Sequence, residues 1–203
     1  MKPKNIFFKT ILLLSLSLLI IVYIFPAAGC SNSPKRFEDT REKMGTFVNI
    51  IIYGSEDNNE EIIESSFQKI DELNKVASNY DSESSVSVLN RDGIIKNAPA
   101  ELIEIINIAK DYNIKTEGAF DITVNPILEL WSEGLWKESD EIQRQKVNEA
   151  MELMDSGQIR IDGNTITLGK KDMSVTLGGI AKGYIVDEVI ELIKSQGIDS
   201  ALV

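Results

Sequence analysis

The chain has 203 residues, a formal net charge of −11, no histidine and a single cysteine. A chain this acidic is not expected to bind nucleic acid, because phosphate backbones attract basic surfaces. One cysteine excludes an intrachain disulfide, so the fold must be held by its hydrophobic core.

Residues 1–29 have the composition of a secretory signal peptide. Lysines precede an uninterrupted apolar run over residues 11–25, which is shorter than the roughly 20 residues of a typical membrane-spanning helix. The small residues at 27–29 and the cysteine that follows resemble a bacterial lipobox, in which the cysteine becomes the lipidated first residue. We therefore expect an exported protein, lipid-anchored through Cys30 to the extracytoplasmic face of the bacterial cell membrane. The alternative is an uncleaved N-terminal anchor that contains an incidental cysteine.

A polar tether over residues 30–36 is expected to connect this anchor to one domain over residues 37–203. Residues 44–53 are rich in β-branched and aromatic side chains, which predicts a strand. Apolar residues at steps of three and four predict a helix over residues 56–77. Residues 78–90 lose this period and are dense in Ser, Asn and Asp, which predicts a loop.

Pro99 is expected to open a second helix that ends before Gly118 and has Tyr112 on its apolar face. Residues 118–136 contain Gly, Pro and both tryptophans, and we interpret them as an ordered loop that leads into a short helix. Ser139 is then expected to cap a helix that runs to about residue 154.

Alternating apolar residues around an Asp-Gly-Asn turn predict a hairpin over residues 159–168. A strand over 173–177, a helix over 179–196 and a strand that starts at Ser200 are predicted to follow. Because strands and helices are mixed without strict alternation, the expected fold is α+β, one domain with a mixed sheet and flanking helices. The chain stops at Val203 inside what resembles a buried strand, so we expect the C-terminal part of the domain to be missing.

The most informative stretch is TLGGIAKGYIVD, at residues 176–187, between a predicted strand and a predicted helix. Gly178 and Gly179 let a backbone approach a ligand closely, and free N–H groups at a helix start attract an anion. Lys182 lies in the first helical turn, where its ammonium group could reach the same anion. This pattern predicts a phosphate-binding turn, although Gly-Gly pairs and solvated lysines also occur at ordinary helix starts.

Four groups of residues follow one another in a recognisable order. They are MGT from Met44, SNYD from Ser78 leading to SVLN, GAFD from Gly118 leading to Pro126 and Trp131, and LGGIAKGY from Leu177 with Asp187. Together they resemble the ApbE-like family of FAD:protein FMN transferases, many of which are exported bacterial lipoproteins. The resemblance covers residues 44–203, which is the N-terminal part of the family pattern.

The resemblance implies an enzyme that binds FAD with its pyrophosphate against a divalent cation, taken here to be Mg²⁺. The FMN half is moved onto a threonine hydroxyl of a target redox-complex subunit, and AMP is released. Two alternatives remain open from the sequence. One is an exported flavin-binding lipoprotein that stores or delivers FAD, and the other is an FAD pyrophosphatase that produces FMN and AMP without flavinylating a protein.

The resemblance also implies roles for individual residues. Met44 and Tyr80 would contact the flavin nucleotide, and the same pocket would be lined by Ala119, Phe120 and Asp121. The residues alone allow plainer roles, because Met and aromatic side chains are usually core, and Asp121 could cap the segment that follows it.

Lys182 matches the family lysine near the FAD phosphates, and Gly179 matches the position whose backbone carbonyl reaches the cation. Thr176 stands where the family more often has Asp, and its hydroxyl could still bond to the nucleotide. No catalytic residue is assigned. The family's remaining cation ligands and a nearby histidine belong to later motifs, so this chain is expected to lack them and to be inactive as a fragment.

Overall fold

The computed structural model describes residues 35–54 and 58–203. The expected signal peptide, the Cys30 anchor and most of the expected tether lie outside these residues. In the part of the chain that the structure describes, no helix is both long enough and apolar enough to span a membrane.

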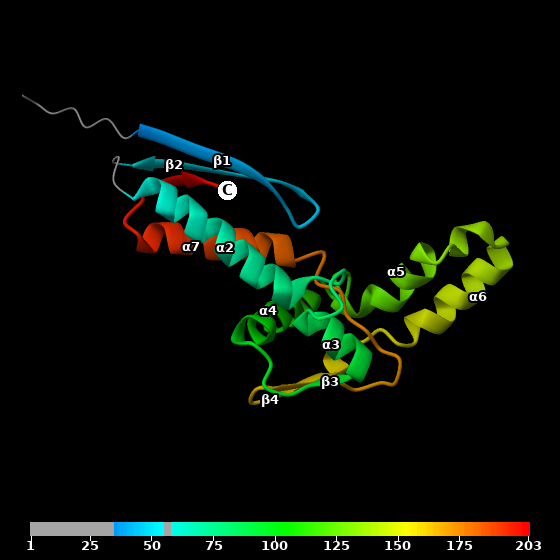
Figure 1. The fold of residues 1–203 in the computed structure, drawn as a ribbon. Coiled ribbons are helices and arrows are strands. Elements are labelled where there is room, and N and C mark those ends of the chain that lie inside the picture. Colours follow the sequence, from blue (N-terminus) through cyan, green and yellow to red (C-terminus); the bar gives the residue numbers. More distant parts are fainter. Residues whose placement is uncertain (1–34, 55–57) are drawn as a thin grey trace, which may run out of the picture. The chain divides into compact units, whose positions relative to one another are not determined.

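The first of two sheets contains β1 (Lys35–Lys43), β2 (Thr46–Gly54) and β6 (Ser200–Leu202), paired antiparallel in the order β1-β2-β6. β2 and β6 confirm predicted strands. β1 was not predicted, because its sequence is largely charged and none of its residues is fully buried. The helices α2 (Asn59–Ala77) and α7 (Ala181–Ser195) pack against each other and against this sheet (Figure 1).

The second sheet has the order β3-β5-β4 and is also antiparallel. Its strands are β3 (Ile94–Ile95), β4 (Ile159–Asp162) and β5 (Thr165–Leu168). β4 and β5 are the predicted hairpin, with Ile159 opposite Leu168. Apolar side chains on alternate positions therefore point into the core, as the period of two requires.

The remaining helices connect and flank these sheets. α3 (Ser85–Asp92) and α4 (Ala100–Lys115) lie between β2 and β4 in the chain, followed by α5 (Asn125–Ser132) and α6 (Asp140–Met151), which lie side by side (Figure 1). Short 3-10 turns flank the α5–α6 pair, at η1 (Ile122–Val124), η2 (Leu135–Lys137) and η3 (Ser156–Gln158). The hydroxyl of Ser139 accepts from the N–H of Ile142, which confirms the predicted cap of α6.

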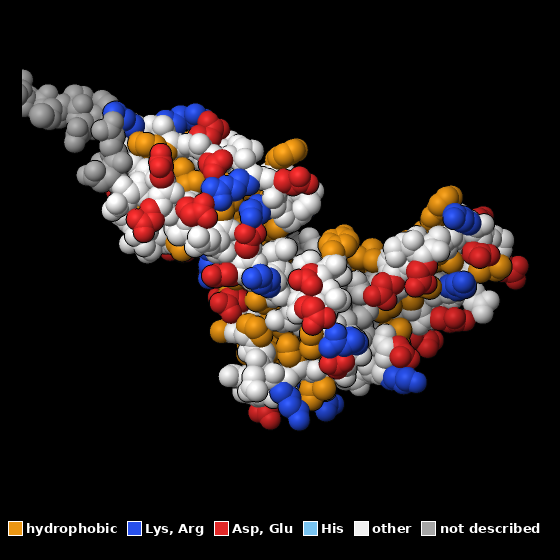
Figure 2. Space-filling view, in the orientation of Figure 1, with side chains coloured by type: hydrophobic (Ala, Val, Ile, Leu, Met, Phe, Trp, Pro, Cys, Tyr) orange, Lys and Arg blue, Asp and Glu red, His pale blue; other side chains and the backbone are white. Residues whose placement is uncertain are grey.

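A single hydrophobic cluster joins the two sheets and the helices between them. Its largest fully buried side chains come from β2, α2, α3, α4, the β4–β5 hairpin and the segment before α7: Ile50, Ile52, Phe67, Ile70, Leu73, Leu89, Leu102, Ile105, Ile106, Ile159, Ile166 and Leu177. On the face that Figure 2 shows, Lys and Arg side chains are interspersed with Asp and Glu, so this face has no extended basic patch.

The α+β class with flanking helices is confirmed, and three local expectations are corrected. The described strands form two antiparallel sheets rather than one mixed sheet. The expected loop over 78–90 contains most of α3, because Ser84 accepts from the N–H of Ser87 and so caps a helix whose Val86 and Leu89 are buried. Tyr112 is half exposed, not part of the apolar face of α4.

The predicted strand over 173–177 is wrong, because these residues form neither helix nor strand and pair with none of the described strands. Met173, Ser174, Val175 and Leu177 are all buried, so this segment belongs to the core although it is not a strand. The Val175 N–H and carbonyl are bonded by the side chains of Asn79 and Asn90 in place of a strand partner.

Candidate functional site

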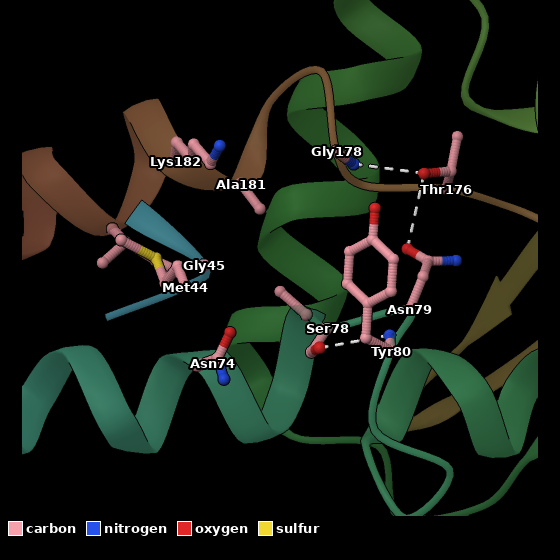
Figure 3. Close-up of a pocket in the computed structure, with 12 residues that line it drawn as sticks. Met44, Gly45, Asn74, Ser78, Asn79, Tyr80, Thr176, Gly178, Ala181 and Lys182 are labelled. Atoms are coloured by element: carbon pink, nitrogen blue, oxygen red, sulfur yellow. Dashed lines mark hydrogen bonds between the residues drawn. The ribbon is translucent and has the colours of Figure 1, made fainter. Parts of the chain in front are cut away.

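A cleft of about 720 Å³ opens where three distant parts of the chain meet. They are the β1–β2 turn, the end of α2 with the loop after it, and the turn before α7 (Figure 3). The lining residues are Met44, Gly45, Asn74, Ala77, Ser78, Asn79, Tyr80, Thr176, Gly178, Ala181, Lys182 and Ile185. Four of the predicted site residues, Met44, Tyr80, Thr176 and Lys182, are therefore brought together.

Met44 is in a strained turn. It forms with Gly45 the two-residue connection between Lys43 and Thr46, which pair across the hairpin, and both turn residues have positive φ, 54° and 68°. Such turns favour Asn-Gly, because a side chain with a Cβ resists the left-handed region. Met44 is half-buried against the core and lines the cleft. A costly backbone conformation at a cleft is the pattern that points to a functional position.

Tyr80 is fully exposed, at a relative accessibility of 101%, although it lines the cleft. Its backbone N–H donates to Oγ of Ser78 at 3.2 Å, which fixes the loop that carries it. In Figure 3 its ring stands on the opposite side of the view from Met44 and Lys182. An exposed aromatic ring at a cleft can stack on a planar ligand, and this side chain does not serve to anchor the loop.

The turn before α7 differs from the prediction in one respect. The N–H groups of Ile180 and Ala181 both donate to the carbonyl of Leu177, at 3.0 and 2.7 Å, and the N–H of Gly178 donates to Oγ1 of Thr176 at 3.2 Å. Most of the amides expected to be free for an anion are thus already bonded. Within the described residues, the ammonium group of Lys182 makes no ion pair or hydrogen bond, so it is the main positive group that the cleft offers a phosphate.

The start of α7 is fixed to α4 by Tyr184. Its hydroxyl donates to Oε2 of Glu104 at 2.8 Å. Burial, together with this bond and the nearby carboxylates, raises the pKa of Tyr184, so the phenol stays protonated. Lys182 lies two residues earlier on the same helix, so this bond helps to hold its position.

Two asparagines hold the extended segment before the turn, and sequence reasoning missed both as site residues. The side-chain amide of Asn90 exchanges two bonds with Val175, donating to its carbonyl and accepting from its N–H, both at 2.8 Å. Asn79 donates to the same carbonyl at 2.9 Å and accepts from Oγ1 of Thr176 and from the N–H of Leu177, each at 3.4 Å. The only sequence feature that could have indicated them is that each Asn belongs to one of the four motifs that resemble the ApbE-like family.

Ala119, Phe120 and Asp121, which were predicted to line the same pocket, are not among the lining residues of the cleft. The Phe120 ring packs against Gly179, where an added Cβ would lie 3.2 Å from Cε2 of Phe120. Gly179 thus allows a close contact behind the turn, and it does not itself line the cleft.

Asp121 is a structural cap in this arrangement. Its carboxylate accepts from the N–H of Thr123 at 2.8 Å, from both the hydroxyl and the N–H of Ser156, and from the side-chain amide of Asn113 at 3.2 Å. Burial acts to raise the pKa of Asp121, but the bonds from Ser156 and Thr123 together outweigh it and lower the pKa. The plainer interpretation of Asp121 as a cap matches these contacts.

The described residues do not form a magnesium site by themselves. Among them there is no group of three or more His, Cys, Asp or Glu that could hold a metal ion, and no carboxylate lines the cleft. Since Mg²⁺ prefers oxygen ligands that include carboxylates or phosphates, we derive no step of the chemistry from a cation held by these residues.

Comparison with known proteins assigns the family. A model described as the ApbE family matches residues 44–203, a span that includes all three parts of the cleft. This chain belongs to the ApbE family. Its α+β architecture is likewise that of solved ApbE structures, the flavin transferase ApbE from Vibrio cholerae (TM-score 0.72, 26% identity, 83% of this chain and 56% of that chain) and the flavinyl transferase ApbE of Pseudomonas stutzeri (TM-score 0.73, 24% identity, 84% and 58%).

Curated ApbE relatives carry one name. A protein of Vibrio cholerae serotype O1 named FAD:protein FMN transferase is 27% identical over 181 residues, covering 87% of this chain and 54% of its own length. One of Treponema pallidum with the same name is 24% identical over 200 residues, covering 91% and 54%. The chain thus spans about half the length of the curated relatives that it matches.

Proposed function

We propose that this ApbE-family chain is a FAD:protein FMN transferase, in which the cleft between the β1–β2 turn, the α2 end and the α7 turn binds FAD. The observation that carries the proposal is the convergence of Met44, Tyr80, Thr176 and Lys182 on one cleft. The relatives' shared name supports FAD as the substrate and a protein as the acceptor.

The cleft offers a different contact to each chemical part of FAD. Tyr80 presents an exposed ring for an aromatic heterocycle, and Lys182 presents a cation for the pyrophosphate. The hydroxyl of Thr176 already accepts from Gly178, and it retains capacity for a further bond to the nucleotide. A volume of about 720 Å³ lies within the range of ordinary ligand sites.

In the proposed reaction, a threonine oxygen of the target protein forms a bond to the phosphorus of the FMN half. The bond from that phosphorus to the bridging oxygen breaks, AMP leaves with the bridging oxygen and its electron pair, and the hydroxyl proton passes to water or a base. The step requires the attacking threonine oxygen and the leaving bridging oxygen to lie in line with the phosphorus, and it requires the negative charge of the pyrophosphate to be neutralised. Lys182 would contribute to the second requirement.

The resemblance implies Mg²⁺ with the Gly179 carbonyl as a ligand, but the described residues add no carboxylate to the cleft, so no step of the proposed reaction is assigned to a cation. We further propose that the acceptor is a subunit of an extracytoplasmic redox complex. Lipidation of Cys30 would hold the protein at the same membrane.

The test incubates a full-length version of the protein, which includes the later family motifs, with FAD, Mg²⁺ and a purified target carrying the acceptor threonine. Transfer predicts flavin fluorescence on the target that survives denaturing electrophoresis, together with one AMP per flavin attached. Release of FMN and AMP without labelled target would replace the proposal by FAD hydrolysis. Recovery of intact FAD bound to the protein would replace it by a binding or delivery role.

A further inference from the structure

We infer that Asn90 is a positioning residue for the FAD site, acting through the backbone of Val175. The inference rests on the proposed function and adds to it a residue that does not line the cleft. Its role follows from how the segment before the α7 turn is held.

The contact between Asn90 and Val175 reproduces one rung of a β-ladder. Asn90, in α3, accepts from the Val175 N–H and donates to the Val175 carbonyl, both at 2.8 Å. A paired strand residue would make the same two bonds to a neighbouring backbone. An amide side chain from α3 therefore takes the place of a strand partner for the segment over 173–177.

The segment has few other constraints on its backbone. Val175 is fully buried, so its polar backbone groups require partners. The Val175 carbonyl also accepts from Asn79 at 2.9 Å, and the Thr176 N–H donates to the Ile122 carbonyl at 2.8 Å, but the Val175 N–H is bonded by Asn90 alone among the described residues. Removing Asn90 would leave the Val175 N–H without its only partner among the described residues.

A change at Val175 is passed directly to the cleft. Thr176 follows it in the chain and lines the cleft, and the Thr176 hydroxyl in turn accepts from Gly178, another lining residue (Figure 3). Asn90 is not a lining residue, so a ligand in the cleft would sense its loss only through this segment. Asn79 both lines the cleft and bonds to Val175, so a substitution there would change direct and indirect contacts together. A substitution of Asn90 tests the indirect contact alone.

The matched control is Asn125. Its side-chain amide donates to Oγ of Ser174 at 3.0 Å, one residue before Val175, and to Oε1 of Glu129. It therefore anchors the same segment by a side chain and does not hold the Val175 backbone. Asn90→Ala and Asn125→Ala each remove one amide without introducing a charge.

FAD affinity is measured by calorimetry at a temperature where thermal unfolding shows all proteins to be folded. We expect Asn90→Ala to bind FAD about tenfold more weakly than the wild type, a loss of the size that one hydrogen bond contributes. Asn125→Ala should bind FAD within about twofold of the wild type. If Asn90→Ala fails to fold, Asn90→Asp, whose carboxylate can accept from the Val175 N–H but cannot donate to the Val175 carbonyl, should show an intermediate loss.

A second readout separates positioning from general loosening. If Asn90 aligns the turn with Lys182 around the phosphates, the double variant of Asn90→Ala and Lys182→Met should lose several-fold less affinity than the product of the single losses. Unchanged affinity in Asn90→Ala, an equal loss in Asn125→Ala, or strictly multiplicative losses would each overturn the inference. Absence of FAD binding by the wild-type chain would instead refute the proposed function.

Discussion

Replacing Lys182 by Met is the most direct test of the proposed phosphate site. The change removes the charge and keeps a stem of similar length, which matters because Lys182 also lines a smaller apolar hollow with Phe47, Val186 and Leu202. Three amides of the turn are bonded within the protein, so the ammonium group carries most of the positive charge available to a phosphate.

The expected loss follows from that geometry. A hydrogen bond to a charged group contributes about 1.5–3 kcal/mol, which corresponds to FAD binding weakened about 10- to 100-fold. Lys182 is exposed and no described carboxylate pairs with it, so the variant should fold as the wild type does. Calorimetric titration with FAD measures the loss directly.

The salt dependence of FAD affinity provides a second test. The screening length falls from about 10 Å at 0.1 M to about 3 Å at 1 M salt, so wild-type affinity should fall with salt more steeply than that of the variant. Lys194→Met is the control, because Lys194 is at the other end of α7 and pairs with Glu191 at 2.8 Å. Affinity of Lys182→Met within twofold of the wild type, or an equal loss in Lys194→Met, would refute the reasoning.

Three further predictions concern other parts of the chain. Gly179→Val should lower thermal stability and weaken FAD binding, because its Cβ would meet the Phe120 ring at 3.2 Å, whereas Gly183→Ala, with open space at the Cβ, should do neither. Asp121→Asn should lower the free energy of unfolding by about 1–2 kcal/mol at pH 7, since the bonds from Ser156 favour the carboxylate. Because the folded pKa of Asp121 lies below its ordinary 3.8, that stabilisation is present above about pH 4 and is lost as the pH falls further, so wild type and variant should converge in acid denaturation series. Cys30→Ser should move the protein from the membrane fraction to the soluble fraction and abolish labelling by a fatty-acid analogue.

Each of these has an outcome that would contradict it. Unaltered melting of Gly179→Val would mean that the Phe120 contact is not tight. A stability difference at Asp121 that stays constant down to pH 2 would mean that its carboxylate is not favoured by folding. Membrane retention of Cys30→Ser without label would favour the uncleaved anchor.

The sequence by itself determined the features that depend on local pattern. The period of two predicted the β4–β5 hairpin, and the period of three to four predicted α2, α4 and α7, because an element that buries one face repeats apolar residues at its own structural period. Four spaced motifs were enough to indicate the ApbE family and to name Met44, Tyr80, Thr176 and Lys182. These side chains converge on one cleft although no local pattern relates them.

Only the tertiary structure decided how the site is held together. The sequence pattern of 173–177 fits a strand, yet the Val175 backbone groups bond to the side chains of Asn79 and Asn90, which precede the segment by more than 80 residues in the chain. Likewise, whether the amides before α7 are free depends on how the turn closes on Leu177, and the left-handed Met44 is imposed by the register of β1 against β2. Hydrogen bonds between residues so far apart in the chain form only after whole helices and strands have packed together. The spacing of residues in the sequence therefore does not predict them.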